Sequence, residues 1–244
     1  MIPDLSERAT GARELMDEPD ADRAMLDRTY ALFPLVNAAV SGWRGVYRRD
    51  IRPFVRRGAL RVLDVGAGGG DLTRMIAGRL RQDGCDAQVT GLDIDPRAVS
   101  WASAQDGPPG VRWLCASTSD LVADGEIFDL VISNHVLHHL ARGQLADVLA
   151  DSVRLLAPEG AVLHGDIARS RTAYALFSAA TWPLARTVLA GSFIRPDGLT
   201  SIRRAFTADE LAAVAGDGWS IERRMPSRLL LLARGPRARE STDA

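Results

Sequence analysis

Three histidines and one aspartate are the residues of this chain best suited to move a proton. His135, His138 and His139 follow an apolar run that ends at Ser133, and Asp166 lies near the end of a later apolar run. An imidazole with an unperturbed pKa of about 6.5 can accept a hydroxyl proton at neutral pH. We predict His135 as the catalytic base because it comes first after its run. Asp166 is the reserve candidate, and water as the proton acceptor stays open.

The spacing of these histidines also raises the question of a metal site. A helix beginning near residue 134 would place His135, His138 and His139 on one side. No fourth ligand follows at a metal-binding spacing, so we expect no metal.

A glycine-rich stretch, RVLDVGAGGGD from Arg61 to Asp71, organises the chain around it. The apolar run Leu60 to Val65 predicts a buried strand, and apolar residues at helical spacing begin at Leu72. Glycines between a strand and a helix let a ligand lie against bare backbone near unpaired N–H groups. Asp71 at the helix start would repel a pyrophosphate, which favours a cationic or zwitterionic ligand.

An acidic residue ends the second predicted strand. The run Gln88 to Leu92 leads into Asp93, twenty-three positions after Gly70 (93 − 70). An acid at about this distance from a glycine loop can accept hydrogen bonds from ribose hydroxyls. Asp95 precedes Pro96 and is expected to cap a helix. We therefore assign Asp93 to the ribose and expect Ile94 to pack on an adenine ring.

These motifs resemble those of the class I S-adenosylmethionine-dependent methyltransferases. The strand-end acid and glycine turn resemble motif I of that family, and the segment FDLVISNHVLHHL from Phe128 resembles its fourth strand and the helix that follows. The resemblance covers Ala59 to Arg234. It implies that S-adenosylmethionine is the cofactor and S-adenosylhomocysteine the product. The residues it assigns to the aminoacyl part of the cofactor are Asp64, Gly66, Ala67, Gly68 and Gly70. A glycine turn that only tightens the corner between strand and helix is the alternative.

Adenine recognition departs from the family pattern. Relatives often carry an acidic residue after the third strand, here Val111 to Cys115, and Ser117 occupies that position. Ser117, Thr118 or the backbone would have to bind the adenine amino group, while Asp120 is expected to be a turn or cap residue. Asn134 follows the fourth strand and is added to the cofactor residues by its position.

Segments on both sides of the predicted sheet could enclose a substrate. Helices over Asp20 to Phe33 and Leu35 to Val55 are expected, interrupted at Pro34 and Pro53. Arg169 to Phe206 reads as a lid, in which a helical stretch leads into the loop SFIRPDGLTSIRRAF. In both segments, packing on the core without contact to a substrate is the alternative. The residues that we assign to the substrate pocket are Tyr30, Trp43, His138, Tyr174, Phe177 and Phe193, and Trp182 and Phe206 were expected to line it as well.

The fold that these elements predict is an α/β fold. We expect a doubly wound, Rossmann-like, mostly parallel seven-stranded sheet whose last strand is antiparallel, with N-terminal helices and a helical lid. Residues 1–58 are expected to form an N-terminal helical cap and residues 59–234 the methyltransferase domain, with a lid insertion at 168–206. Residues 235–244 are expected to be a disordered tail.

The amino-acid composition excludes some classes of binding partner and some cellular locations. Thirty basic against thirty-one acidic residues give a net charge of −1 in 244 residues, so no nucleic acid partner is expected. Cys85 and Cys115 lie far apart and read as reduced thiols. The N-terminus lacks the apolar region of a signal peptide, and no apolar run reaches the ~18 residues of a membrane span. We expect a cytoplasmic protein with a small-molecule substrate; a homodimer stays open.

The function expected from the resemblance is methyl transfer from S-adenosylmethionine to a small molecule. The chain looks most similar to bacterial enzymes of quinone biosynthesis and polyketide tailoring, so the acceptor would be a hydroxyl of an apolar, aromatic or polyketide-like molecule. Methyl transfer to carbon of a quinone-like ring is one alternative, and a non-catalytic protein that binds the cofactor is another. An RNA or protein substrate is disfavoured by the neutral charge and by the absence of an Asn-Pro-Pro-Tyr-like signature.

Overall fold

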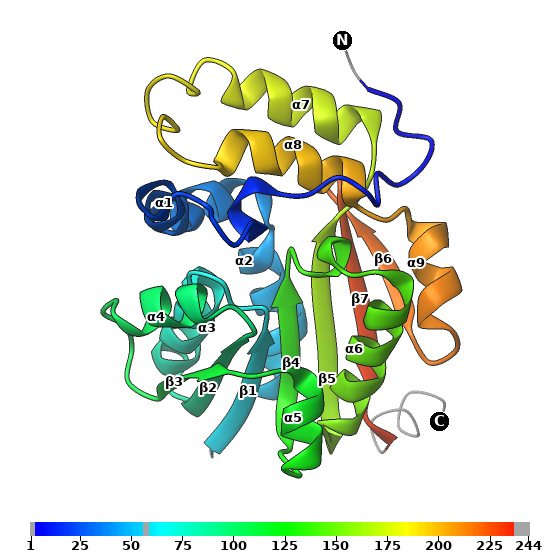
Figure 1. Ribbon diagram of the computed structural model, residues 1–244. Coiled ribbons are helices and arrows are strands. Elements are labelled where there is room, and N and C mark those ends of the chain that lie inside the picture. The colour runs from blue at the N-terminus through cyan, green and yellow to red at the C-terminus, as the bar shows by residue number, and fades with distance from the viewer. Residues whose placement is uncertain (1–2, 56–58, 237–244) are drawn as a thin grey trace.

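The computed structural model describes residues 3–55 and 59–236 (Figure 1). The strands are β1 (Ala59–Val65), β2 (Asp86–Asp93), β3 (Val111–Cys115), β4 (Phe128–Asn134), β5 (Leu156–Ile167), β6 (Ser220–Arg224) and β7 (Arg228–Arg234). The α-helices are α1 (Arg23–Val40), α2 (Trp43–Val46), α3 (Asp71–Gln82), α4 (Pro96–Ser103), α5 (Thr118–Ala123), α6 (Arg142–Arg154), α7 (Arg171–Thr181), α8 (Ile194–Arg204) and α9 (Ala208–Ala215). The shorter helical turns are η1 (Leu15–Asp17), η2 (Tyr47–Ile51), η3 (Arg52–Phe54) and η4 (Leu137–His139).

The strands form one seven-stranded sheet in the order β3-β2-β1-β4-β5-β7-β6. The first five strands pair in parallel, and β7 joins β5 in antiparallel register, with Ile167 opposite Arg228. This confirms the predicted fold class, including the antiparallel last strand. Chain order reverses between β1 and β4, and the carboxyl ends of strands at such a switch point are where ligands bind in open α/β sheets.

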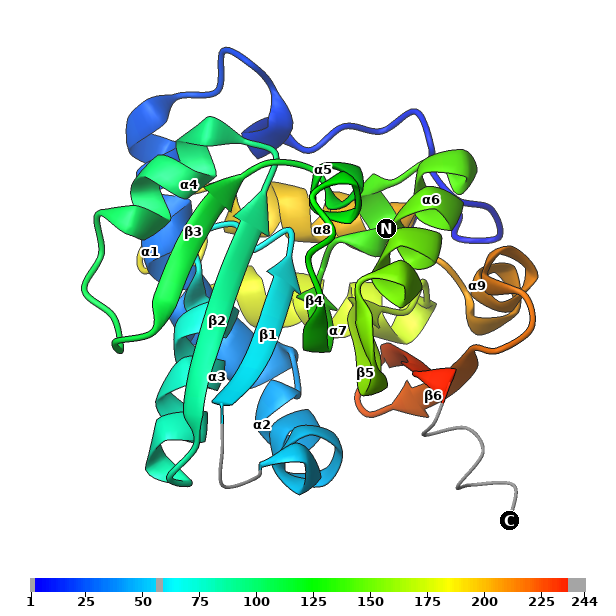
Figure 2. The same cartoon turned by 90° about the horizontal axis from the view of Figure 1, so that it is seen from below.

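Helices bury both faces of the sheet, because side chains on successive strand residues point to opposite sides. Leu60 and Val62 of β1 belong to a core with α2 and α3, whereas Leu63 and Val65 belong to a core with α5 and the start of β5. Figure 2 shows α2 and α3 on one side of the strands and α5 and α6 on the other. Both faces of the sheet are therefore covered by helices.

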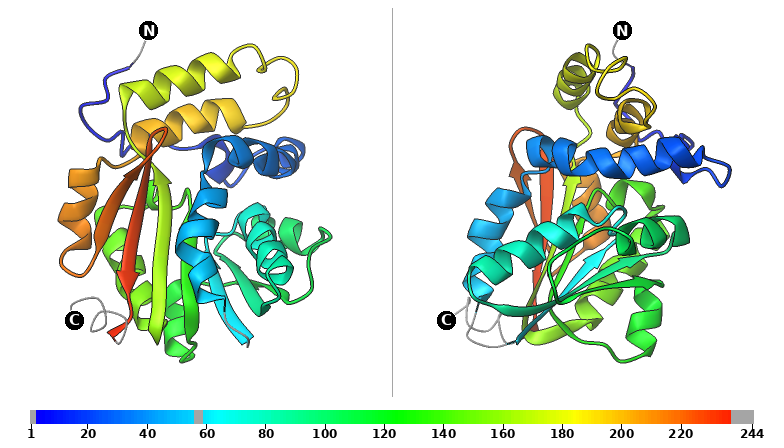
Figure 3. Two further views of the ribbon diagram at one scale, coloured as in Figure 1. Left: turned by 180° about the vertical axis from the view of Figure 1, so that it is seen from behind. Right: turned by 90° about the vertical axis from the view of Figure 1, so that its left-hand side faces the viewer.

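Helices α7 and α8 lie over the carboxyl edge of the sheet. Figures 1 and 3 show α8 next to the strand ends and α7 beyond it, with the N-terminal residues running between α8 and the sheet. The Phe177 ring lies against Gly198, where an added Cβ would stand 2.3 Å from it, so glycine is required for the close approach of α7 to α8. The structure thus places helices over this edge, where a lid was expected.

The lid and the N-terminal helices differ in detail from the prediction. Residues 192–206 are predicted as a loop, but residues 194–204 form α8. Proline is tolerated in the first turn of a helix, where its missing N–H has no partner to lose. Helix α1 likewise continues through Pro34, and its Leu26 and Tyr30 are buried against the domain. Tertiary packing outweighs the local cost of the proline.

Elements near β4 and β5 also depart from expectation. The expected helix of the histidines is only the 3-10 turn η4, and the backbone enters it through His135 at φ 61°. Strand β5 begins at Leu156 and runs through Pro158 to Gly160, and its pairing with β4 shifts register between Phe128 and Leu130.

The predicted helix cap at Asp95 is confirmed, because Asp95 accepts from Arg97 N at the start of α4. Thr207 and Glu210 form the capping box of α9. Strands β6 and β7 form a terminal hairpin. Most of the expected tail, residues 237–244, lies outside the described residues, and the division into a cap and a domain stays a prediction. Across residues 3–55 and 59–236, none of the helices combines the length and apolar character needed to cross a membrane.

Candidate active site

The glycine loop between β1 and α3 has open space beside one glycine, whereas neighbouring side chains occupy the space beside two others. An added Cβ at Gly66 would stand 2.4 Å from Val136, and one at Gly70 would stand 2.2 Å from the Trp113 ring. At Gly68 an added Cβ would meet nothing within 4 Å. All three glycines have positive φ, a conformation that costs other residues energy. The loop therefore presents bare backbone at Gly68, as a cradle for a ligand requires.

Asp93 ties this loop to the end of β2. Its Oδ2 accepts a hydrogen bond from Gly68 N at 2.8 Å, and its Oδ1 accepts one from Asp95 N at 2.9 Å. Each carboxylate oxygen can accept a further bond. Burial raises the pKa of Asp93, and the two backbone N–H groups oppose that rise. The carboxylate is thus fixed beside the glycine loop with acceptor capacity to spare.

Asp64 lies behind the loop instead of facing its open side. The side chain is 1% exposed, and its Oδ2 accepts from Thr73 Oγ1 at 2.6 Å, which joins β1 to α3. Burial raises the pKa of Asp64 to about 8. This contact does not favour the expected direct role in holding a ligand, because the carboxyl group is enclosed between strand and helix.

The residues expected around adenine separate into two groups. Ile94 is 77% exposed directly after Asp93 and is free to cover a planar ring. Ser117 caps α5 and shares a capping box with Asp120, as expected for that aspartate. Thr118 faces away, because its Oγ1 donates to Asp151 Oδ2 at 2.9 Å and joins α5 to α6. The structure therefore keeps Ile94 and the Ser117 segment near the site and removes the Thr118 side chain from it.

Asn134 and His135 meet a buried arginine at the end of β4. Arg228 Nη2 donates to Asn134 Oδ1 at 2.5 Å, and Arg228 Nη1 donates to His135 Nε2 at 2.7 Å. Arginine has only donors, so His135 must accept at Nε2 and its ring is neutral. Burial and Arg228 together lower the pKa of His135 well below 6.5. These contacts do not favour His135 as the base that its sequence position predicted.

His138 lies between two carboxylates and is withdrawn from the surface. Its Nδ1 stands 2.8 Å from Asp166 Oδ1, and its Nε2 stands 3.3 Å from Glu14 Oε1. Burial opposes a charge on His138, but the two carboxylates outweigh it and raise its pKa to about 10. Asp166 also accepts from the backbone N–H groups of His138 and Ile167. We call Glu14, His138 and Asp166 the buried triad.

The contacts of the buried triad bear on two sequence-based predictions, the role of Asp166 as the second candidate base and the absence of a metal site. His138 holds the pKa of Asp166 far below its usual range although burial opposes this, so Asp166 is a poor proton acceptor. Candidate ligand atoms within 4.8 Å of one another come from two sets, Glu14 with His138 and His139, and His135 with His138 and Asp166. Sequence spacing missed these sets because Glu14 and Asp166 come from distant segments.

Four residues expected in the substrate pocket are instead interior in this structure. Tyr30 packs over Gly69 and beside Trp101, and Phe193 packs with Tyr30 and Leu26. Trp43 belongs to the core below α3 and touches Gly165 of β5. Their exposed fractions are 3% for Tyr30, 5% for Phe193 and 2% for Trp43, and the fourth residue is His138, at 1%. Tyr30 and Trp43 still lie at the loop and at the strand ends, so they support the walls of the site.

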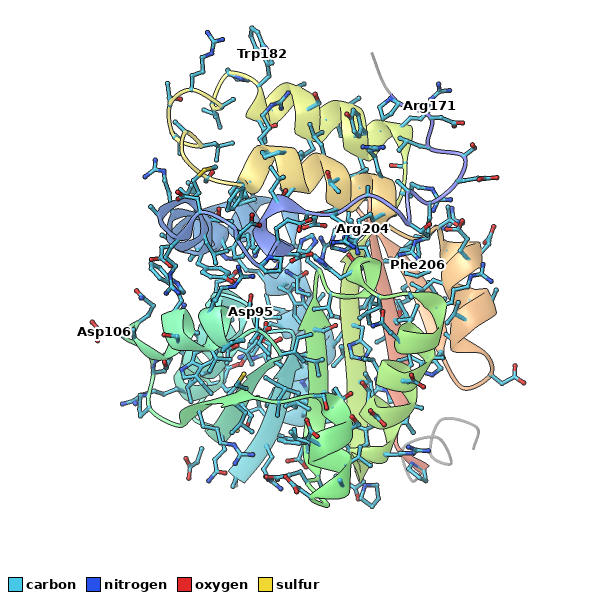
Figure 4. All side chains as sticks on the ribbon, in the orientation of Figure 1. Asp95, Asp106, Arg171, Trp182, Arg204 and Phe206 are labelled. Carbon is cyan, nitrogen blue, oxygen red and sulfur yellow. The ribbon has the colours of Figure 1, made fainter. Side chains whose placement is uncertain are left out.

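Two aromatic residues of the lid are partly exposed, and two others do not lie where a substrate pocket was expected. Tyr174 and Phe177 on α7 are partly exposed. Trp182 is 73% exposed and points away from the sheet, as Figure 4 shows, so it does not line a pocket between lid and sheet. Phe206 is buried with α6 and α9, and the Arg8 guanidinium lies 3.6 Å from its ring centroid. Aromatic character alone could not separate these positions.

Two residues of the site were missed from the sequence. Arg228 begins β7, and an antiparallel strand begins at the edge where parallel strands end, so the predicted topology contained the signal. Glu14 lies in a polar N-terminal stretch with no periodicity, and nothing in the sequence indicated that its carboxylate would be 3% exposed beside His138. Its placement depends on tertiary contacts alone.

Comparison with known proteins finds methyltransferases. A family model described as a methyltransferase domain matches residues 62–160. A ubiquinone biosynthesis O-methyltransferase of Rhizobium rhizogenes is 28% identical over 191 residues, which cover 72% of this chain and 73% of that protein. One from Caulobacter sp. is 31% identical over 165 residues, covering 64% and 61%.

Solved structures extend the likeness to nearly the whole chain. The plantazolicin methyltransferase BpumL in complex with SAH is similar at a TM-score of 0.65 and 11% identity, covering 91% of this chain and 92% of that one. Human N-acetylserotonin methyltransferase in complex with SAM is similar at a TM-score of 0.61 and 16% identity, covering 88% of this chain and 56% of that one. At these identities the likeness shows a shared fold.

Proposed function

Because this chain is a class I S-adenosylmethionine-dependent methyltransferase of the small-molecule type, we propose that it methylates a hydroxyl of an apolar, aromatic or polyketide-like molecule. The observation that carries the proposal is the junction of Gly68 and Asp93, where open backbone and a carboxylate are joined by a 2.8 Å hydrogen bond. This junction lies at the sheet edge where β4 also delivers Asn134 and His135. A cofactor and an acceptor could therefore meet there.

The cofactor residues of the proposal are those at the open side of the loop. Gly66, Ala67, Gly68 and Gly70 would hold the aminoacyl part, Asp93 the ribose, and Ile94 with the Ser117 segment the adenine. The open space at Gly68 fits such a ligand, and Asp93 keeps acceptor sites free for hydroxyl groups. When bound, S-adenosylmethionine would supply a methyl group already activated by its sulfonium.

In the proposed reaction, the residues of the chain align the acceptor oxygen with the methyl group and determine where the hydroxyl proton goes. Holding an acceptor oxygen near the end of β4 gives the in-line approach that supplies much of the rate in a displacement. His135 is neutral and hydrogen-bonded to Arg228, and Asp166 is enclosed by His138, so neither is suited to store a proton. We propose that the hydroxyl proton passes to water and that no metal takes part. The Arg228 guanidinium bonded to His135 disfavours a dication at His135, His138 and Asp166.

Product analysis tests the proposal. The protein is incubated with methyl-labelled S-adenosylmethionine and a panel of phenols, naphthols and aromatic polyketides, and products are identified by mass spectrometry and NMR. We expect the labelled methyl group to be part of a methyl ether, from which strong acid releases it. Label on a ring carbon would replace the proposal with carbon methylation. Tight binding of S-adenosylhomocysteine without transfer to any acceptor would favour a cofactor-binding protein without catalysis.

A further inference from the structure

Arg228 occupies an unusual position for a cation. It is the first residue of β7 and lies opposite Ile167 of β5, so its side chain starts at the carboxyl edge of the parallel strands. The residue is 5% exposed. Its two Nη atoms are both directed to the end of β4, one to Asn134 and one to the next residue, His135.

The hydrogen-bond partners of Arg228 carry no negative charge. Among the described residues, no carboxylate oxygen lies within ion-pairing distance of its guanidinium, and the acid that acts on its pKa is Asp166. Asp166 already faces His138 and two backbone N–H groups. Burial lowers the pKa of Arg228 to about 10, so it stays charged at neutral pH. A buried cation without a direct counterion is costly, and an anionic ligand would offset that cost.

His135 is the more exposed neighbour of this cation. Arg228 Nη1 lies 2.7 Å from its Nε2 and 3.5 Å from its Nδ1, so the neutral ring accepts from Arg228 at Nε2 and carries its hydrogen on Nδ1. Nδ1 lies 3.9 Å from Asp166 Oδ1, beyond hydrogen-bond distance, and that oxygen is already paired with His138. The side chain is 25% exposed, whereas that of His138 is 1% exposed. His135 also adopts a φ of 61°, which is uncommon for a residue other than glycine and is often kept at functional sites.

We propose that Arg228 and His135 hold the acceptor oxygen of the substrate as an anion, so the enzyme selects hydroxyl groups that ionise readily. This inference rests on the proposed function and names its substrate class: phenols or enols made acidic by an electron-withdrawing group. The hydroxyl loses its proton to water on binding. The oxygen anion then forms a bond to the methyl carbon as the bond from carbon to sulfur breaks, leaving a neutral ether and a neutral thioether.

A coloured phenol measures this anion site without any methyl transfer. Para-nitrophenol is titrated spectroscopically in the presence of excess protein and S-adenosylhomocysteine, because its phenolate alone absorbs in the visible range. We expect the bound pKa to fall by about one unit or more, which is about tenfold more phenolate at a given pH, as a nearby opposite charge produces. The variant Arg228→Gln should abolish the shift, and Arg228→Lys should retain part of it.

Matched controls separate this inference from folding and from the proposed function. Arg223→Gln removes an exposed arginine of the same hairpin and should leave the shift intact. Calorimetric binding of S-adenosylhomocysteine shows that each variant keeps its cofactor site. If Arg228→Gln does not fold, the test is the pKa shift of para-nitrophenol bound to the wild-type protein. An unchanged pKa, no saturable effect on the phenol, or an equal shift in Arg228→Gln overturns the inference. A shift without methyl transfer would instead refute the proposed function and leave the anion site standing.

Discussion

Asp93 and Asp95 stand two residues apart and have separable roles. Asp93 connects the glycine loop to β2, whereas Asp95 caps α4 and forms an ion pair with Arg97. The sequence predicted this division because a proline follows Asp95 and an apolar strand precedes Asp93. The pair therefore provides a matched test of the cofactor site.

Replacing Asp93 with alanine should weaken binding of S-adenosylmethionine by about 1–3 kcal/mol, the usual cost of losing hydrogen bonds to a charged group. Asp95→Ala should instead lower the free energy of unfolding by about 1 kcal/mol through loss of the cap, with a smaller effect on binding. Calorimetric titration and thermal unfolding of both variants measure these effects. Equal losses of affinity at the two positions would show that the ribose acid was misassigned.

The role of His135 predicts a difference between two substitutions. His135→Ala removes a donor to the acceptor oxygen and should lower kcat by about 10²-fold, as loss of one oxyanion donor does. His135→Gln keeps an N–H donor and should retain much more of the activity. Both variants should recover at high pH as the substrate ionises unaided. If glutamine is as damaging as alanine while cofactor affinity is unchanged, His135 is a base after all.

At the scale of elements, the N-terminal residues 5–18 form a strap between the lid and the sheet. Arg8 donates to the carbonyl oxygens of Arg204, His138 and Leu140, and Asp197 of α8 accepts from the N–H groups of Leu15 and Met16. Figure 4 shows Arg204 and Phe206 at the C-terminal end of α8, above the strand ends. The strap therefore holds α8 over the site.

Arg8→Ala should release α8 by leaving those carbonyl groups without their donor and Phe206 without its covering guanidinium. We expect faster hydrogen exchange in residues 194–204, slowed again by S-adenosylhomocysteine with a bound phenol. Hydrogen exchange followed by mass spectrometry measures this, with Arg13→Ala at an exposed site of the strap as control. Unchanged exchange in Arg8→Ala would mean that packing of α8 on α1 and α7 suffices.

The ion pairs of the buried triad connect three distant segments of the molecule, the N-terminal strap, η4 and β5. The pKa of His138 is about 10 in the folded protein against 6.5 for the unfolded side chain, so its stabilisation is full below pH 6.5 and is lost as pH rises towards 10. The pKa values of Glu14 and Asp166 are lowered from 4.5 and 3.8, so their stabilisation is present above those values and lost in acid. His135 and His139 are the other histidines that face His138.

The triad should therefore make the free energy of unfolding decline from pH 6.5 towards pH 10, because His138 loses its proton in that range. In His138→Asn, the decline between pH 6.5 and 10 should be much shallower, although the variant is less stable at pH 6. Chemical denaturation across this pH range measures both slopes. A wild-type profile that is flat from pH 6.5 to 10 would contradict a protonated His138 in the folded protein.

The sheet was predictable because its signals are local. The apolar runs ending at Val65 and Asp93, the glycine turn and the capping box at Thr207 each determine their own backbone. The interior of the site was less predictable. Pro196 could begin a helix or form a turn, and only packing on α7 decides between them. Arg228 and Glu14 become functional candidates through contacts with residues more than ninety positions away.

A crystal structure with S-adenosylhomocysteine would show directly where the cofactor lies. We expect the ribose hydroxyls to bind Asp93, the aminoacyl part to lie along Gly66 to Gly70, and the sulfur to face Asn134 and His135. A cofactor whose ribose lies away from Asp93, or whose sulfur is remote from the end of β4, would contradict this expectation.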